Sequence, residues 1–148
     1  MFSGRLTQVA LRLLDSLGDR LVPAKIAPHR RTGQRGEQDA YFYLRRQGYT
    51  MVARNYRSPR RHGEIDLIGW DANVLCFVEV KARSEHDLKP AEAAVDRRKR
   101  EEVIAVAREY LRLLPPDCHW RFDLVSVYYG LPREPLRFEL FRDVLPLS

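Results

Sequence analysis

The first pattern along the chain is a run of apolar residues at the spacing of an amphipathic helix over residues 3–21, with charged and polar side chains between them. Prolines and arginines in residues 23–31 then break this pattern, as in a linker. We therefore expect an amphipathic N-terminal helix and linker over residues 1–32, and a separate domain over residues 33–148. The leading helix could pack on that domain, bind a partner or lie on a membrane surface.

Helical spacing resumes at Gly33 and ends at Gly48, a residue type typical of helix C-termini. Three strand-like segments follow, over residues 49–56, 64–70 and 74–82. A second helix is expected over residues 96–114, because Pro115 and Pro116 stop it, and two further strands over residues 120–128 and 136–141. This α-β-β-β-α-β-β order predicts an α/β fold with a central mixed sheet flanked by helices.

The hairpin formed by the second and third predicted strands is the most informative part of the chain. Taking residues 72 and 73 as the two central turn positions fixes the pairing of the strands. The predicted pairs are Asp71–Val74, Ile68–Phe77, Asp66–Glu79 and Glu64–Lys81. Side chains alternate across a strand, so the last three of these pairs share one face, which is apolar near the turn (Ile68, Trp70, Leu75 and Phe77) and charged at its far end. The opposite face is apolar throughout: Ile65, Leu67, Cys76, Val78 and Val80.

The charged end of this face suggests metal chemistry. Directly opposed residues in a sheet have Cβ atoms roughly 4.5–5.5 Å apart, and like charges there are destabilising. Asp66 and Glu79 therefore call for a cation between them, and Mg²⁺ is commonly held by one or two carboxylates. Lys81 can orient an attacking water or meet the charge that develops on a phosphate. The alternative is a surface salt-bridge patch that pairs Glu64 with Lys81 and Asp66 with Arg83.

Two further charged residues can reach this cluster. Glu37 lies on the buried stripe of the helix that starts at Gly33, so its carboxylate should point toward the sheet. Alternatively, it is simply a favourable negative charge near a helix N-terminus. Lys99 belongs to a basic run at the start of the later helix, close to the edge of its buried face. An anionic substrate would relieve the repulsion between these cations and the helix dipole, whereas the alternative is a solvated basic turn.

The overall charge favours an anionic partner. The formal net charge is +6 and the pI is about 9.6, as for proteins that bind nucleic acid or an anionic membrane surface. Arg54, Arg57, Arg60 and Arg61 form a basic stretch around Tyr56 that could contact a nucleic-acid backbone.

The cysteines and the apolar segments bear on the compartment. Cys76 and Cys118 are far apart and fit reduced thiols better than a disulfide or a zinc site. No apolar run is long enough for a transmembrane segment, and charged residues interrupt any signal peptide. We therefore expect a cytoplasmic protein.

Several motifs, in this order, resemble those of a known family. They are Gly33-x-x-Gly36-Glu37, Arg54-Asn55-Tyr56-Arg57, Gly63-Glu64-Ile65-Asp66-Leu67-Ile68, Phe77-Val78-Glu79-Val80-Lys81, Pro90-Ala91-Glu92-Ala93, Asp96-x-x-Lys99-Arg100 and Arg121-Phe122-Asp123. Over residues 33–127 the chain resembles the YraN family of small bacterial proteins. That family belongs to the restriction-endonuclease-like PD-(D/E)XK superfamily and is similar to archaeal Holliday-junction resolvases.

The resemblance implies a restriction-endonuclease-like core and assigns roles by position. Asp66 stands at the metal-binding Asp of the motif, and Glu79 and Lys81 stand at its E-x-K. Glu37 matches the acidic residue that assists metal binding, and Lys99 matches a phosphate-contacting position on a later helix. Ala82 departs from the pattern, where threonine is common. Similarity to resolvases also implies a homodimer.

Residues and resemblance together predict an endonuclease that uses Mg²⁺ or Mn²⁺ to hydrolyse phosphodiester bonds in structured or branched DNA. Asp66 and Glu79, with Glu37, would hold the metal, and Lys81 would position the water. The alternative is a non-catalytic nucleic-acid-binding or adaptor protein on the same fold.

Overall fold

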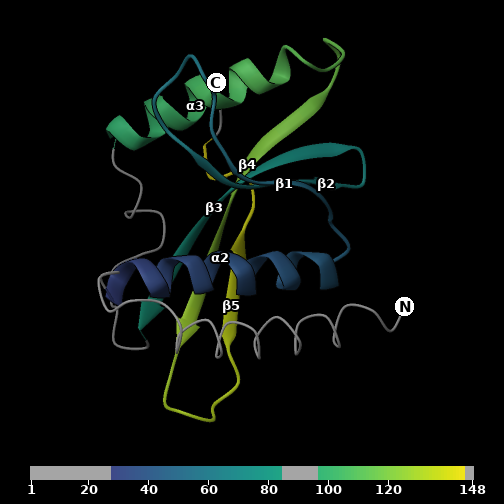
Figure 1. Cartoon of the computed structure of the whole chain (residues 1–148). Helices are drawn as coiled ribbons and strands as arrows, with labels where there is room; N and C mark the ends of the chain where they lie inside the picture. The colour runs from purple at the N-terminus through teal and green to yellow at the C-terminus, as the bar shows by residue number, and fades with distance from the viewer. Residues whose placement is uncertain (1–27, 85–96, 146–148) are drawn as a thin grey trace.

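The computed structural model describes residues 28–84 and 97–145, with side chains described from residue 33 onward (Figure 1). The predicted N-terminal helix lies outside the described residues. The elements are α2 (Pro28–Arg46), β1 (Thr50–Tyr56), β2 (Ile65–Asp71), β3 (Val74–Ser84), α3 (Arg97–Leu111), β4 (His119–Tyr129) and β5 (Arg137–Phe141). This order confirms the predicted α/β fold. Among the described helices, none is long and apolar enough to cross a membrane.

The five strands form one mixed sheet in the order β1-β2-β3-β4-β5. β3 and β4 are parallel, and every other neighbouring pair is antiparallel. A parallel pair needs a long crossover connection, and α3 lies between these two strands in the chain.

Each helix covers a different face of this sheet. On the α2 face, Ala40 and Leu44 pack with a cluster that includes Val78 and Val125. On the α3 face the buried cluster consists of Ile65, Ile68, Leu75, Phe77, Val103, Val106, Ala107, Phe122 and Leu145. Strand residues of alternating parity thus separate into two cores. Ile65, expected on the opposite face with Leu67, instead joins the α3 cluster at the position where β2 begins.

α2 begins earlier than the sequence pattern indicates. Residues 28–32, expected to be linker, are helical, and Pro28 is the first residue of the helix. Proline suits this position because its fixed φ angle is compatible with a helix and its missing N–H has no partner in the first turn. Pro28 therefore marks a helix start, where the proline and arginine pattern was expected to break the helix.

The β2–β3 hairpin has the predicted register. Asp71 pairs with Val74 across the turn, and Ile68 pairs with Phe77. The described ladder ends at Leu67–Val78, one position before the expected Asp66–Glu79 pair. At that point the Asp66 carboxylate accepts a hydrogen bond from the Val80 backbone N–H at 2.8 Å. A side chain thus bonds to the backbone of β3 just beyond the last pair of the ladder.

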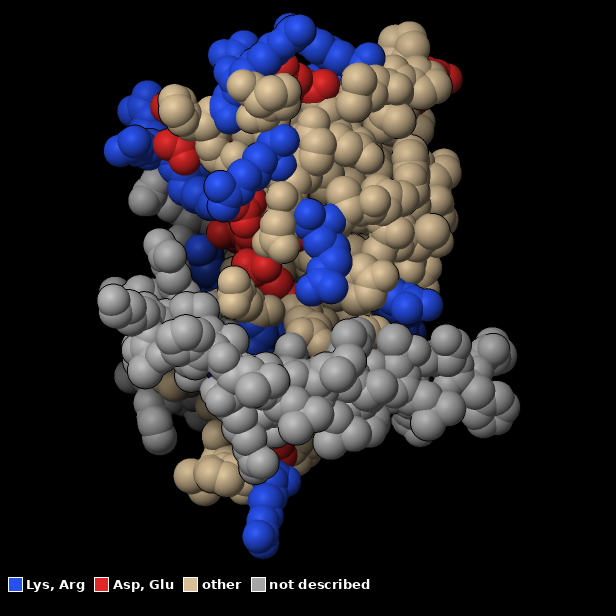
Figure 2. All heavy atoms as spheres, in the orientation of Figure 1, with Lys and Arg blue, Asp and Glu red and all other residues tan. Residues whose placement is uncertain are grey.

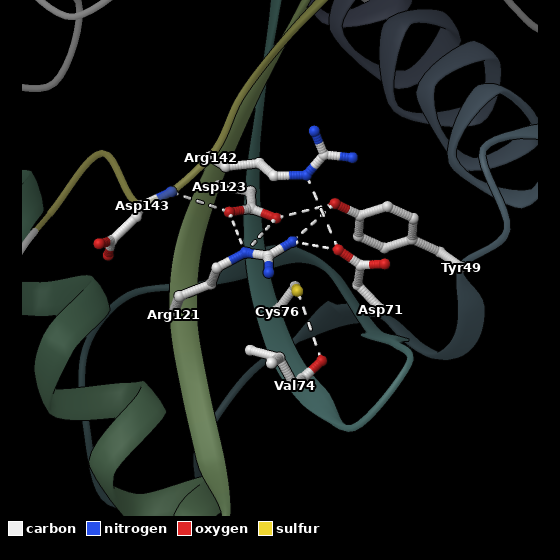
Figure 3. A network of polar contacts seen from close by, with 8 residues as sticks. All are labelled: Tyr49, Asp71, Val74, Cys76, Arg121, Asp123, Arg142 and Asp143. Carbon is white, nitrogen blue, oxygen red and sulfur yellow. Dashed lines mark hydrogen bonds and ion pairs between the residues drawn. The ribbon is translucent and has the colours of Figure 1, made fainter.

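A buried polar network ties the strands together at the turn end of the hairpin (Figure 3). Arg121 Nε of β4 donates to Asp123 Oδ1 at 2.9 Å, and Arg121 Nη2 donates to Asp71 Oδ2 of β2 at 2.6 Å. Tyr49, next to β1, donates its hydroxyl to Asp123 Oδ2 at 3.0 Å. The Asp143 backbone N–H, just beyond β5, donates to Asp123 Oδ1 at 3.1 Å. Asp123 is only 1% exposed, and these bonds satisfy both of its oxygens.

Candidate functional site

The predicted site residues from four different elements meet at the other end of the sheet. Asp66 lies at the start of β2, and Glu79 and Lys81 lie on β3. Glu37 comes from α2 and Lys99 from α3, the helices on opposite faces of the sheet. Groups from both faces can meet here because the β2–β3 ladder has ended.

α2 approaches the sheet closely beside the site. A Cβ atom placed on Gly36 would lie 3.2 Å from the Cβ of Ala82, so there is little room for a larger residue. Gly36 precedes Glu37, and Ala82 follows Lys81. The contact between these two small residues thus lets α2, and Glu37 with it, come close to β3, the strand that carries Lys81.

Asp66 is the most perturbed acid of the cluster. Its residue is 9% exposed, and one oxygen accepts the Val80 N–H. Burial, followed by the negative charge of Glu79, raises the pKa of Asp66 to about 8, with Glu37 adding to the effect. The Val80 N–H and Lys99 act in the opposite direction but are outweighed. A nearby cation would strongly stabilise the ionised form of a carboxyl group in these surroundings.

Glu79 lies between two lysines. Lys81 Nζ is 2.9 Å from Glu79 Oε1, and Lys99 Nζ is 3.8 Å from Glu79 Oε2. Its side chain is only 13% exposed, and Oε2 is a buried atom without a hydrogen-bond partner among the described residues. Such an oxygen loses its hydration without gaining a full replacement. The salt-bridge alternative is thus wrong in its pairing of Lys81, whose described partner is Glu79.

Two members of the site were not assigned to it from the sequence, namely Glu64 and Asn55. Carboxylate oxygens of Glu37, Glu64 and Asp66 all lie within 4.8 Å of one another. Asn55 Nδ2 donates to Glu37 Oε2 at 2.6 Å and to Glu64 Oε1 at 3.2 Å. Arg57 Nε donates to Glu64 Oε2 at 2.6 Å, so the described partners of Glu64 are Asn55 and Arg57.

The sequence alone could not place Asn55 beside the acids, because that placement depends on the register of β1 with β2. The β1–β2 ladder shifts register between Met51 and Ala53, so counting from one end of the strand gives the wrong partners at the other. Beyond the shift, Arg54 pairs with Leu67 and Tyr56 pairs with Ile65. Asn55 therefore stands across from Asp66.

The donor set suits a divalent cation. Mg²⁺ and Mn²⁺ prefer carboxylate oxygens and water. Oxygens of Glu37, Glu64 and Asp66 lie within 4.8 Å of one another, and the negative charge of Glu79 acts on Asp66 from β3. Asp66 is the most deeply buried of these acids. Glu37 and Glu64 lie nearer the surface, where they could bind through water.

Basic side chains surround this acidic cluster. Figure 2 shows acidic atoms in the middle of the described face, with basic atoms above them and to either side. Arg54 lies over the ring of Tyr41, 5.0 Å from its centroid. Arg60 Nε is 3.8 Å from Glu109 of α3, and the Arg60 N–H donates to Ser58 Oγ at 3.1 Å. Ser58 also donates its hydroxyl to Glu109, which fixes the basic loop against α3.

The four predicted arginines thus have different surroundings. Arg57 and Arg61 are both exposed, and Arg57 is paired with Glu64 of the site. Arg54 and Arg60 have the ring and ion-pair contacts described above. The structure places the stretch beside the acidic cluster, on the side of β1 and α3.

A mixed sheet with a helix on each face and an acid-lysine cluster at one strand end defines an α/β protein with a nuclease-like fold. Residues 36–127 match the model of the uncharacterised protein family UPF0102, and the chain belongs to this family, also called YraN. The predicted family is therefore confirmed.

Close relatives carry the same family name. A UPF0102 protein of Koribacter versatilis is 49% identical over 128 residues, covering 86% of this chain and 87% of the relative. One from Solibacter usitatus is 52% identical over 98 residues, covering 64% and 73%. One from Porphyromonas gingivalis is 38% identical over 122 residues, covering 82% and 89%.

Proposed function

We propose that this protein is an endonuclease dependent on Mg²⁺ or Mn²⁺ that hydrolyses phosphodiester bonds in structured or branched DNA. The observation that carries the proposal is the buried Asp66 with the half-buried Glu79 next to it, beside Lys81 and Lys99 at a strand end with arginines around it. Folding alone gives no reason to bury two repelling carboxylates at this point.

Asp66 and Glu79 would hold the metal, with Glu37 and Glu64 beside them. When bound, the metal would lower the pKa of a water molecule and stabilise charge on the phosphate. The ordered N–H of Val80 fixes one oxygen of Asp66 and leaves the other for coordination.

The lysines would act on the substrate. Lys81 lies 2.9 Å from Glu79 Oε1, within reach of a water held by that carboxylate, and can orient the water for attack. Lys99 projects from the first turn of α3 and can contact a phosphate oxygen with its ammonium group. Arg54, Arg57, Arg60 and Arg61 would bind neighbouring phosphates regardless of sequence.

One observation favours a second candidate, a non-catalytic DNA-binding or adaptor protein. Both oxygens of Glu79 face a lysine, so the cluster can neutralise part of its own charge without a metal. In that case the arginines would still bind DNA, but the acids would do no chemistry.

A cleavage assay tests the two candidates against each other. Purified protein would be incubated with four-way-junction, flapped and linear duplex DNA, with Mg²⁺, with Mn²⁺ and with EDTA. We expect metal-dependent cleavage by the wild type and its loss in Asp66→Asn and Lys81→Ala. Arg137→Ala, on β5 in an ion pair with Glu139, serves as the control that keeps activity. Binding without cleavage of any of these substrates would refute the endonuclease and support the adaptor.

Two further properties belong to the proposal. The protein would act as a homodimer in the cytoplasm, whose reducing conditions suit the two free cysteines. Light scattering of the purified chain, with and without junction DNA, tests the dimer: a monomer under both conditions would refute it.

A further inference from the structure

Asn55 occupies a backbone conformation that few residues adopt. It lies inside β1 with a φ angle of 47°, in the left-handed region. Asparagine enters this region more readily than other residues that have a side chain, and glycine enters it most readily. The backbone alone would therefore accept either Asn or Gly at this position.

The side chain of Asn55 makes contacts that glycine could not make. Its single amide nitrogen carries two hydrogens and donates to Glu37 at 2.6 Å and to Glu64 at 3.2 Å. The two acceptors belong to different parts of the chain, one on α2 and one in the loop before β2. Asn55 is thus a bridge between two carboxylates that would otherwise repel each other.

This bridge lies directly beside Asp66. The neighbouring pairs Arg54–Leu67 and Tyr56–Ile65 place Asn55 across from Asp66 in the sheet. Both of the carboxylates it holds have an oxygen within 4.8 Å of an oxygen of Asp66. Arg57 holds the second oxygen of Glu64 at 2.6 Å, so Glu64 is fixed from two sides, whereas the described hydrogen bond to Glu37 comes from Asn55.

We propose that Asn55 is a positioning residue that holds Glu37 and Glu64 against Asp66 and so sets the affinity of the site for a divalent cation. This inference rests on the proposed function, in which these acids serve a metal. Partners that orient metal-binding groups typically change metal affinity by about 10–100-fold when they are removed.

Two substitutions separate the amide from the backbone conformation. Asn55→Gly removes both hydrogen bonds but keeps the left-handed backbone relaxed. Asn55→Ala removes the same bonds and also strains the backbone. If the amide positions the acids, both variants lose Mn²⁺ affinity by a similar factor, and Asn55→Ala has the lower melting temperature of the two because it adds backbone strain.

The measurement is calorimetric titration of MnCl₂ into the purified full chain, with thermal unfolding followed in parallel. We expect Asn55→Gly to bind Mn²⁺ about 10–100-fold more weakly than the wild type. Asn73→Gly, which changes an exposed asparagine in the β2–β3 turn, is the matched control and should bind as the wild type does.

The outcomes are distinguishable. Wild-type affinity in Asn55→Gly, or a loss confined to Asn55→Ala, would overturn the positioning role while leaving the metal site intact. A wild type that takes up no Mn²⁺ would overturn the proposed function and this inference together.

Discussion

Replacing Asp66 by asparagine should stabilise the protein in the absence of metal. Asp66 is 9% exposed, and its pKa rises from an ordinary value of 3.8 to about 8, because of burial and then of Glu79. Asparagine keeps an oxygen that can accept the Val80 N–H, but it carries no charge to bury. The variant should therefore avoid the loss of stability that the folded wild type suffers when Asp66 ionises.

The sign and the size follow from proton linkage. Between pH 4 and 8 the folded protein keeps a proton on Asp66 that the unfolded chain has released, so the wild-type free energy of unfolding falls as the pH rises. Each pKa unit corresponds to about 1.4 kcal/mol. We expect the advantage of Asp66→Asn to grow from near zero at pH 4 to about 2–5 kcal/mol at pH 8, and then to level off.

Urea unfolding at closely spaced pH values between 5 and 9, in EDTA, measures this advantage. Asn73→Gly, which changes an exposed residue of the β2–β3 turn and removes no titratable group, is the control and should give a difference that does not vary with pH. Excess Mn²⁺ should shrink this advantage, because a ligand at 100 times its Kd stabilises the wild type by about 2.7 kcal/mol and the variant lacks the acid that would bind it. A pH-independent difference, or a wild type more stable than Asp66→Asn at pH 8 in EDTA, would refute the reasoning.

Two other predictions concern the buried network at the turn end. Asp123→Ala removes one of the two carboxylates that pair with the half-buried Arg121 and also the acceptor of the Tyr49 hydroxyl, and should destabilise the fold by about 3–5 kcal/mol in urea unfolding. A loss below about 1 kcal/mol would contradict the role of this network in holding the strands together. Cys76 is fully buried, and burial, followed by the charge of Asp123, raises the pKa of its thiol to about 12. Iodoacetamide at pH 8 should therefore modify the partly exposed Cys118 well before Cys76, as followed by peptide mass spectrometry, and equal rates would contradict this.

The hairpin could be predicted from the sequence because its turn is short and its pairing is regular. A two-residue loop fixes the register of Ile68 with Phe77, and from there alternation leads to Asp66 and Glu79. The α-β-β-β-α-β-β order followed from helical and strand periodicity in the same way. The family motifs pointed to these same residues.

The β1 side of the site could not be predicted in this way. The register shift near Val52 and the left-handed backbone at Asn55 are both tertiary features without a periodic signal. Counting along the β2–β3 hairpin matched Glu64 with Lys81, but that ladder ends at Leu67–Val78, and in the structure Arg57 and Asn55 of the β1 side hold Glu64. Irregular backbone occurs here where the site is assembled, as is common in functional regions.

The buried carboxylate of Asp66 has a consequence for the descent of this family. If Asp66 binds the proposed metal and asparagine at this position makes the metal-free fold more stable, one conservative substitution both abolishes metal binding and improves folding. Selection for a stable fold alone would then favour the loss of the acid, and only a requirement for its chemistry would oppose that loss. The residue at this position would in that case show, lineage by lineage, where the activity is still needed.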